Sequence, residues 1–96
     1  MGDVLVVFGS ESDKPVFEPL MEMFADKGIK ANLEVCSAHR NPEKLIEILA
    51  ESEEKIVVAG AGLSAALPGF IASHSKKLVI GVPVKSNYSG LDALLS

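Results

Sequence analysis

The stretch Asp3-Val-Leu-Val-Val-Phe-Gly-Ser-Glu-Ser-Asp13 determines how the rest of the chain is interpreted. Its first six residues form a nearly continuous apolar run rich in β-branched side chains. Such a run, ended by Gly9, is typical of a strand buried on both faces of a parallel sheet. A helical pattern follows, in which Ser12 is the expected N-cap and Pro15 lies in the first turn. Apolar residues then recur at helical spacing as far as Lys27-Gly28, which predicts the end of this helix.

The rest of the chain repeats this order of strand and helix. We expect strands at residues 31–36, 55–59 and 78–82, and helices that begin at Asn41-Pro42, near Leu63 and at Gly90. Pro68-Gly69 would interrupt the third helix or shift its start. The short connections predict right-handed crossovers and a parallel sheet with helices on both faces. At 96 residues, we expect one domain, 1–96.

Composition excludes several classes of function. Nine Lys and Arg against 13 Asp and Glu give a net charge of −4, whereas binding to a nucleic-acid backbone needs clustered positive charge. No apolar run reaches the roughly 18 residues of a membrane span, and the N-terminus lacks the basic region of a signal peptide. Cys36 is the one cysteine, so we expect no internal disulfide and a cytoplasmic location. The expected partner is a small molecule or another copy of the chain.

Polar and glycine-rich segments follow each expected strand. They are Gly9–Asp13, Ser37–Arg40, Gly60–Gly62 and Lys85–Gly90. In open parallel sheets, ligands bind beyond the carboxyl ends of the strands. The sequence therefore predicts a ligand site where these four segments meet.

Two of these segments carry groups suited to a phosphorylated substrate, although each also has a purely structural interpretation. Gly9–Asp13 offers hydroxyls and backbone N–H groups at a helix N-terminus, which is either a phosphate cradle or a helix cap. His39 and Arg40 place a proton carrier beside an anion clamp, and the arginine would lower the pKa of the imidazole. Without further context, local packing of His39 and a surface ion pair of Arg40 are the favoured explanation of these two residues.

Other site types receive less support. The run Gly60-Ala-Gly62-Leu-Ser-Ala65 matches a dinucleotide-binding pattern, but residues 79–82 lack the acidic residue that should hold the ribose. These glycines then indicate close approach of a ligand or a tight turn. His39, His74 and Cys36 lack the spacing of a metal site. We expect His74 at the surface of a helix end and Cys36 in the core.

Taken together, the motifs resemble the PurE family of purine biosynthesis over essentially the whole chain. The matching stretches, in the order of the family, are Gly9–Asp13, Ser37-Ala-His-Arg-Asn-Pro42, Ala59–Gly62 with Leu67-Pro-Gly69, and Gly81-Val-Pro-Val84 with Ser89-Gly-Leu-Asp92. This resemblance implies a flavodoxin-like three-layer α/β/α sandwich. It also implies a cytoplasmic homo-octamer without a metal or organic cofactor.

The resemblance also implies an activity and a set of site residues. The substrate would be a ribonucleotide of aminoimidazole, whose carboxylate moves from N5 to C4; a second class of the family carboxylates aminoimidazole ribonucleotide directly with CO2. His39 would be the catalytic proton carrier. Ser10 and Asp13 would hold the phosphate–ribose portion, and Arg40 would help to clamp it. The full set of expected substrate-binding residues is Gly9, Ser10, Ser12, Asp13, Ser37, Arg40, Gly60 and Gly62.

Two departures from the family pattern keep other functions open. Ala66 and Leu63-Ser64 depart from the bacterial-type pattern, which usually has histidine at the position of Ala66, whereas Arg40 agrees with it. The family also continues with another strand and a C-terminal helix, so we expect these 96 residues alone to be oligomeric or poorly behaved. A silent ribonucleotide-binding or assembly module is therefore the alternative from another class. A phosphoacceptor receiver would need an Asp at Ala59-Gly60, and a flavodoxin would need more aromatic residues.

Overall fold

The computed structural model describes residues 2–38, 40–61 and 66–84 of the chain. Strands and helices alternate along it, as predicted. In chain order the elements are β1 (Val4–Phe8), the 3-10 helix η1 (Glu11–Asp13), α1 (Lys14–Asp26), β2 (Ala31–Val35), α2 (Pro42–Glu51), β3 (Ile56–Ala61), α3 (Ala66–His74) and β4 (Leu78–Pro83). Each observed strand lies within two residues of its predicted bounds. The expected helix from Gly90 and the segment Lys85–Gly90 lie outside the described residues.

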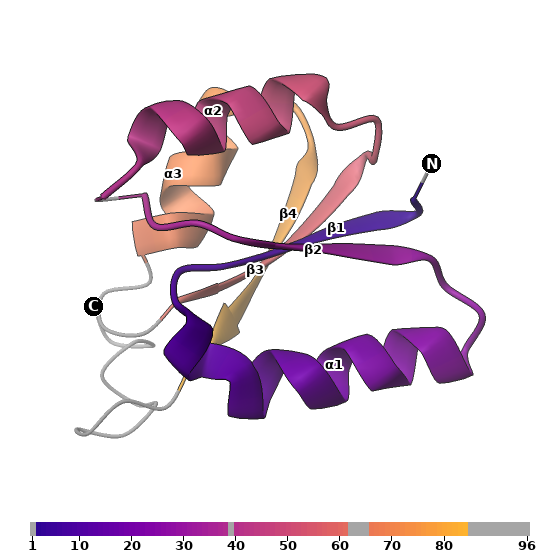
Figure 1. The fold of residues 1–96 in the computed structure, drawn as a ribbon. Coiled ribbons are helices and arrows are strands. Elements are labelled where there is room, and N and C mark those ends of the chain that lie inside the picture. The colour runs from indigo at the N-terminus through magenta and orange to yellow at the C-terminus, as the bar shows by residue number, and fades with distance from the viewer. Residues whose placement is uncertain (1, 39, 62–65, 85–96) are drawn as a thin grey trace.

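The four strands form one parallel sheet in the order β2-β1-β3-β4. Val4 lies opposite both Ala31 and Ile56, and Ile56 lies opposite Leu78, so the strands start nearly level. In Figure 1, α2 and α3 lie on one side of the sheet and α1 lies on the other. This arrangement confirms the expected flavodoxin-like α/β fold with helices on both faces.

The core has two parts, one on each face of the sheet. Residues of β1 alternate between them, because successive side chains of a strand point to opposite faces. Toward α2 and α3 lie Leu5, Val7, Cys36, Leu45, Leu49, Val57, Ala59, Leu67 and Ile71, and toward α1 lie Val4, Val6, Phe8, Phe17, Phe24, Val58 and Val84. Every residue of β1 is buried, which explains why its sequence is an unbroken apolar run.

The helices begin and end close to the predicted residues, but the capping hydrogen bonds at their ends differ from those predicted. The expectation of Ser12 as N-cap is wrong, because Asp13 occupies the N-cap position of α1. Ser12 lies in the preceding η1 helix, which Ser10 caps by accepting a hydrogen bond from the Ser12 N–H. Asn41 does occupy the N-cap position of α2, but its side chain makes no capping bond. Gly28 follows α1 with a φ of 72°, a left-handed conformation that favours glycine. In α3, Pro68 lies in the first turn, where its missing N–H costs little, so this proline does not interrupt the helix.

Candidate functional site

The carboxyl ends of the four strands meet at one edge of the sheet. Phe8 of β1 lies opposite Val35 of β2 and Gly60 of β3, and Gly60 lies opposite Val82 of β4. The residues that follow these strands therefore start from neighbouring positions. Within the described residues this edge brings together the segments 9–13, 36–38 and 40–41, as the sequence predicted.

The loop after β1 is a compact turn built on Ser10. Its hydroxyl lies 2.8 Å from the Ser12 hydroxyl and accepts a hydrogen bond of 3.1 Å from the Ser12 N–H. The Ser10 carbonyl accepts a bond of 3.0 Å from the Asp13 N–H. Both hydroxyls lie on the molecular surface directly before α1, where a ligand beyond the strand ends can reach them.

Asp13 differs from its neighbours because it is partly buried. Burial raises the pKa of its carboxyl group, and a hydrogen bond with the backbone of Ser10 acts in the opposite direction. Asp13 is the N-cap residue of α1, but its side chain makes no capping bond. The carboxyl group of Asp13 is thus not used in capping α1, whereas the hydroxyl of Ser10 does cap the η1 helix.

The segment after β2 forms a second turn, centred on Ser37. The Ser37 hydroxyl accepts a hydrogen bond of 3.2 Å from the Arg40 N–H, and the Ser37 carbonyl accepts one of 2.9 Å from the Asn41 N–H. Arg40 is exposed, and within the described part of the chain no acidic side chain forms an ion pair with it. The surface ion pair considered for Arg40 is therefore not formed there. His39 and Gly62, also predicted for the site, lie outside the described residues.

Cys36 lies at the same edge but belongs to the core. Its N–H donates to the Phe8 carbonyl at 2.8 Å, and its Sγ donates to the Asn41 carbonyl at 3.6 Å. Burial raises the pKa of the thiol, the opposite of what a nucleophilic cysteine needs. The predicted packing role of Cys36 is confirmed.

The two described glycines of the predicted site differ in what surrounds them. A Cβ atom on Gly9 would meet no described atom within 4 Å, so open space lies above this residue. A Cβ atom on Gly60 would collide with the Phe8 ring. Packing alone therefore requires glycine at position 60, whereas glycine at position 9 leaves room at the edge of the sheet.

His74 has the surface position that the sequence predicted. It ends α3, its ring stacks on Phe70 with centroids 4.3 Å apart, and its Nδ1 lies 2.9 Å from the Phe70 carbonyl oxygen. Among residues 2–38, 40–61 and 66–84, no three potential metal ligands lie close enough together to hold an ion. None of the helices described is long and apolar enough to cross a membrane.

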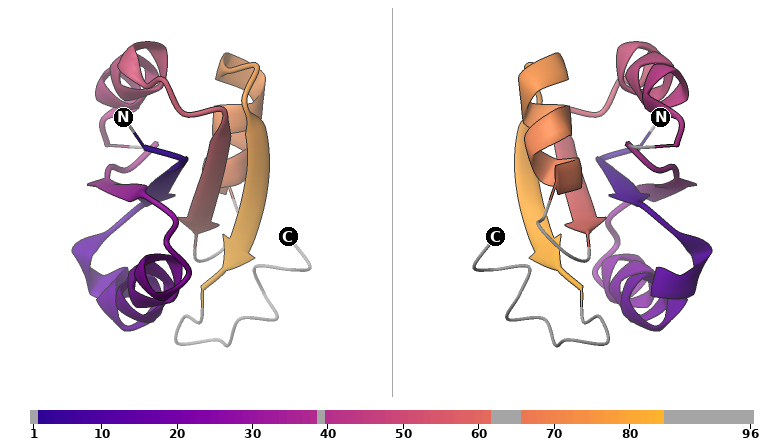
Figure 2. Two further views of the ribbon diagram at one scale, coloured as in Figure 1. Left: turned by 90° about the vertical axis from the view of Figure 1, so that its right-hand side faces the viewer. Right: turned by 90° about the vertical axis from the view of Figure 1, so that its left-hand side faces the viewer.

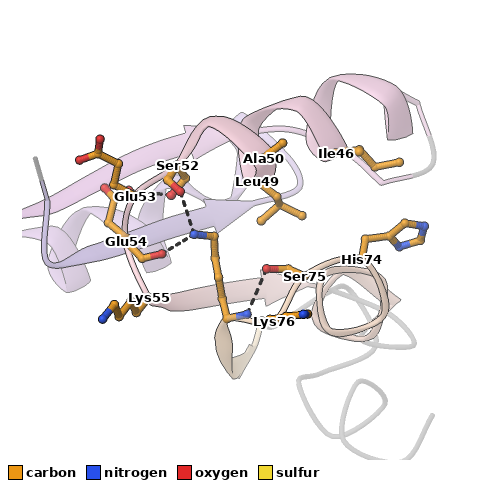
Figure 3. Close-up of a pocket in the computed structure, with 11 residues that line it drawn as sticks. Ile46, Leu49, Ala50, Ser52, Glu53, Glu54, Lys55, His74, Ser75 and Lys76 are labelled. Atoms are coloured by element: carbon orange, nitrogen blue, oxygen red, sulfur yellow. Dashed lines mark hydrogen bonds between the residues drawn. The ribbon is translucent and has the colours of Figure 1, made fainter.

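A cavity of about 520 Å³ lies at the opposite edge of the sheet, between the ends of α2 and α3 (Figure 3). Its walls include Ile46, Leu49, His74 and Lys77. None of the described residues predicted for the site lines this cavity. The carboxyl edge, with its two hydroxyl-bearing turns, remains the candidate site.

The sequence did not predict a buried polar network beside that cavity. Glu54 is only 6% exposed, and its carboxylate accepts hydrogen bonds from the Ser52 hydroxyl at 2.6 Å and the Asn32 amide at 2.5 Å. The Lys77 ammonium group donates to the backbone carbonyls of Ser52 and Glu54. A charged run such as Glu51-Ser-Glu-Glu-Lys55 is usually solvated, so no local signal distinguished Glu54 from its neighbours.

The fold and its polar edge define a doubly wound α/β protein of the flavodoxin-like class, with its candidate site beyond the strand ends. The chain belongs to the AIR carboxylase family, whose model matches residues 3–96. A relative from Methanocaldococcus jannaschii, named N5-carboxyaminoimidazole ribonucleotide mutase, is 43% identical over 93 residues, which are 97% of this chain and 59% of that protein. A relative of the same name from Thermotoga maritima is 42% identical over 100 residues, covering all of this chain and 58% of its own length.

The solved structures agree with this assignment. The crystal structure of Treponema denticola PurE superposes with a TM-score of 0.84 at 29% identity, covering 97% of this chain and 63% of that one. The family expected from the motifs is thereby confirmed. The chain spans about 60% of the length of these relatives.

Proposed function

We propose that this chain acts in purine biosynthesis, converting N5-carboxyaminoimidazole ribonucleotide to 4-carboxyaminoimidazole ribonucleotide. The observation that carries the proposal is the match of nearly the whole chain to relatives named as this mutase. The polar turns at the carboxyl edge of the sheet support it, because they offer hydroxyls and a guanidinium group to a phosphorylated substrate. The proposed site residues are His39 for catalysis, and Gly9, Ser10, Ser12, Asp13, Ser37, Arg40, Gly60 and Gly62 for binding.

In the proposed mechanism the substrate loses its N5 carboxylate as CO2 and regains it at C4. The N–C bond breaks and the nitrogen takes up a proton; C4 then attacks CO2, and the proton on C4 leaves as the ring regains aromaticity. One acid–base group can carry both protons, and we assign this role to His39. Retaining CO2 within the site makes its recapture effectively unimolecular. The space above Gly9 supports close approach of the substrate to the backbone.

The proposal also covers the cellular location, the assembly and the cofactor requirement of the protein. We infer a cytoplasmic homo-oligomer that binds the ribonucleotide and its carboxylate or CO2 and that acts without a metal or organic cofactor. Direct carboxylation of aminoimidazole ribonucleotide is the second candidate, because the matching family model describes an AIR carboxylase.

An assay with each substrate tests the proposal. We expect the purified chain to consume N5-carboxyaminoimidazole ribonucleotide and to leave aminoimidazole ribonucleotide with bicarbonate unchanged, as followed by absorbance of the product. Turnover of only the second pair would identify a direct carboxylase. Binding of the ribonucleotide in calorimetry, with turnover of neither substrate, would identify a silent binding module and contradict the proposed activity.

The loop after β1 gives a prediction about binding. Ser10→Ala and Asp13→Ala should each raise KM by about 10-fold or more and change kcat far less, because these groups hold substrate and transition state alike. Glu11→Ala, between them in the exposed η1 helix, is the matched control and should leave both constants unchanged. A collapse of kcat at constant KM would instead assign the loop to the chemical step.

A further inference from the structure

The loop that carries Ser10 and Asp13 has no buried side chain of its own. None of residues 9–16, all of which the structure describes, is buried, and only Val16 at the end of this segment packs partly against the core. The hydrogen bonds of Ser10 described above stay within the loop. The position of the loop on the edge of the sheet therefore depends on the residues at its two ends.

Two aromatic side chains occupy these ends, and they contact each other. Phe8 is the last residue of β1, and Phe17 lies in the first turn of α1. Their ring centroids are 5.4 Å apart and their planes are inclined by 60°, which is an edge-to-face contact between two buried rings. α1, seen nearly end-on in Figure 2, brings Phe17 to this face of the sheet. The pair thus joins the two ends of the segment 9–16.

The Phe8 ring needs free space on the neighbouring strand. Gly60 of β3 lies opposite Phe8, and a Cβ atom there would lie 2.6 Å from Cδ2 and Cζ of the ring and closer still to Cε2. Carbon atoms in contact are usually about 3.5–4.0 Å apart. The missing side chain of Gly60 therefore makes room for the ring, which connects β3 to α1 through its contact with Phe17.

We propose that Phe8 is a positioning residue of the candidate site. Its ring, held between Gly60 and Phe17, fixes the loop at residues 9–13 relative to β3. Its carbonyl accepts the Cys36 N–H at 2.8 Å, where the second turn of the site begins. Phe8 is fully buried, so it acts through these segments and does not touch the substrate. Its effect on substrate binding rests on the proposed function, whereas its effect on the loop does not.

Phe8→Val tests the effect on the loop, because valine suits a strand and lacks the ring. The Ser12 and Asp13 amides should exchange with solvent at least about 10-fold faster. KM for N5-carboxyaminoimidazole ribonucleotide should rise about 10-fold while kcat changes far less, since the loop holds substrate and transition state alike. Phe24→Val, the same exchange in the same part of the core near the other end of α1, is the matched control. It should lower stability but leave KM and the loop amides unchanged.

A second substitution tests the pairing of ring and glycine, and it needs no activity. Gly60→Ala alone should lower the midpoint of urea unfolding sharply or prevent folding, because its methyl group collides with the ring. Combined with Phe8→Val, the same substitution should leave the midpoint unchanged or raise it, since the methyl group fills the space left by the ring. KM of the double variant should equal that of Phe8→Val, because the side-chain position of residue 60 faces the core on the side of α1.

Three results would overturn the proposal. The first is unchanged exchange of the Ser12 and Asp13 amides in Phe8→Val, and the second is equal acceleration in Phe24→Val, since lost stability would then explain both. The third is equal destabilisation by Gly60→Ala with and without the Phe8 ring. A wild-type chain that neither binds nor converts the ribonucleotide would instead contradict the proposed function, and the amide exchange would still decide whether Phe8 fixes the loop.

Discussion

His39→Asn is expected to lower kcat at least about 100-fold while the chain still folds and binds the ribonucleotide. Asparagine retains hydrogen-bonding groups of similar size, but it cannot accept and release a proton near neutral pH. The proposed reaction needs one proton delivered to nitrogen and one removed from C4, so a site without a carrier should stall between these steps. Steady-state kinetics with N5-carboxyaminoimidazole ribonucleotide would measure the loss.

The chain provides its own control for this experiment. His74 is the other of its two histidines, and its ring stacks on Phe70 at the far end of α3, beside the cavity at the opposite edge of the sheet. His74→Asn should therefore leave kcat and KM unchanged. Near-normal turnover of His39→Asn, with circular dichroism and ribonucleotide binding intact, would remove His39 from the mechanism.

The strands and their positions along the chain were predictable because burial imposes a strong pattern. All five residues of β1 are buried, and a strand with two covered faces must be apolar throughout. The alternation of strands and helices predicts a parallel sheet, and the carboxyl ends of parallel strands lie at one edge. The candidate site follows from this topology, so Ser10 and Arg40 could be assigned to one edge although they are far apart in sequence.

Contacts between side chains were less predictable, since small differences in geometry decide them. Ser10 and Ser12 are both good capping residues, and only the fold of the turn makes Ser10 the acceptor. Gly60 matched a ligand-binding pattern, yet the Phe8 ring on the neighbouring strand already requires a glycine there. The partners of Glu54 lie 22 and 23 residues away in sequence, at Asn32 and Lys77, beyond the reach of any local pattern.

Among the described residues, the hydrogen-bond network of Glu54 is where we expect a substitution to change the free energy of unfolding most. Hydrogen bonds from Ser52 and Asn32 and the nearby Lys77 charge lower the pKa of the Glu54 carboxyl group, and together they outweigh the opposing effect of burial. The ionised carboxylate therefore stabilises the folded state. Glu54→Gln keeps the shape but removes the charge and one of the two acceptor oxygens, so we expect a loss of about 2–3 kcal/mol at neutral pH, typical of hydrogen bonds to a charged group.

The destabilisation caused by Glu54→Gln should also depend on pH, in a direction that the lowered pKa determines. A carboxyl group whose pKa is lowered by folding stabilises the protein above the pKa of the unfolded chain and loses this effect as pH falls through the folded value. The difference in unfolding free energy between wild type and Glu54→Gln should therefore shrink below about pH 4, where the glutamate of the unfolded chain takes up its proton. Urea unfolding at several pH values would measure it, with Glu53→Gln as the control at an exposed neighbour. If the difference in unfolding free energy stayed constant from neutral to acid pH, the destabilisation by Glu54→Gln would come from packing. The charge of Glu54 would then contribute nothing to holding β2, β3 and β4 together at the amino edge of the sheet.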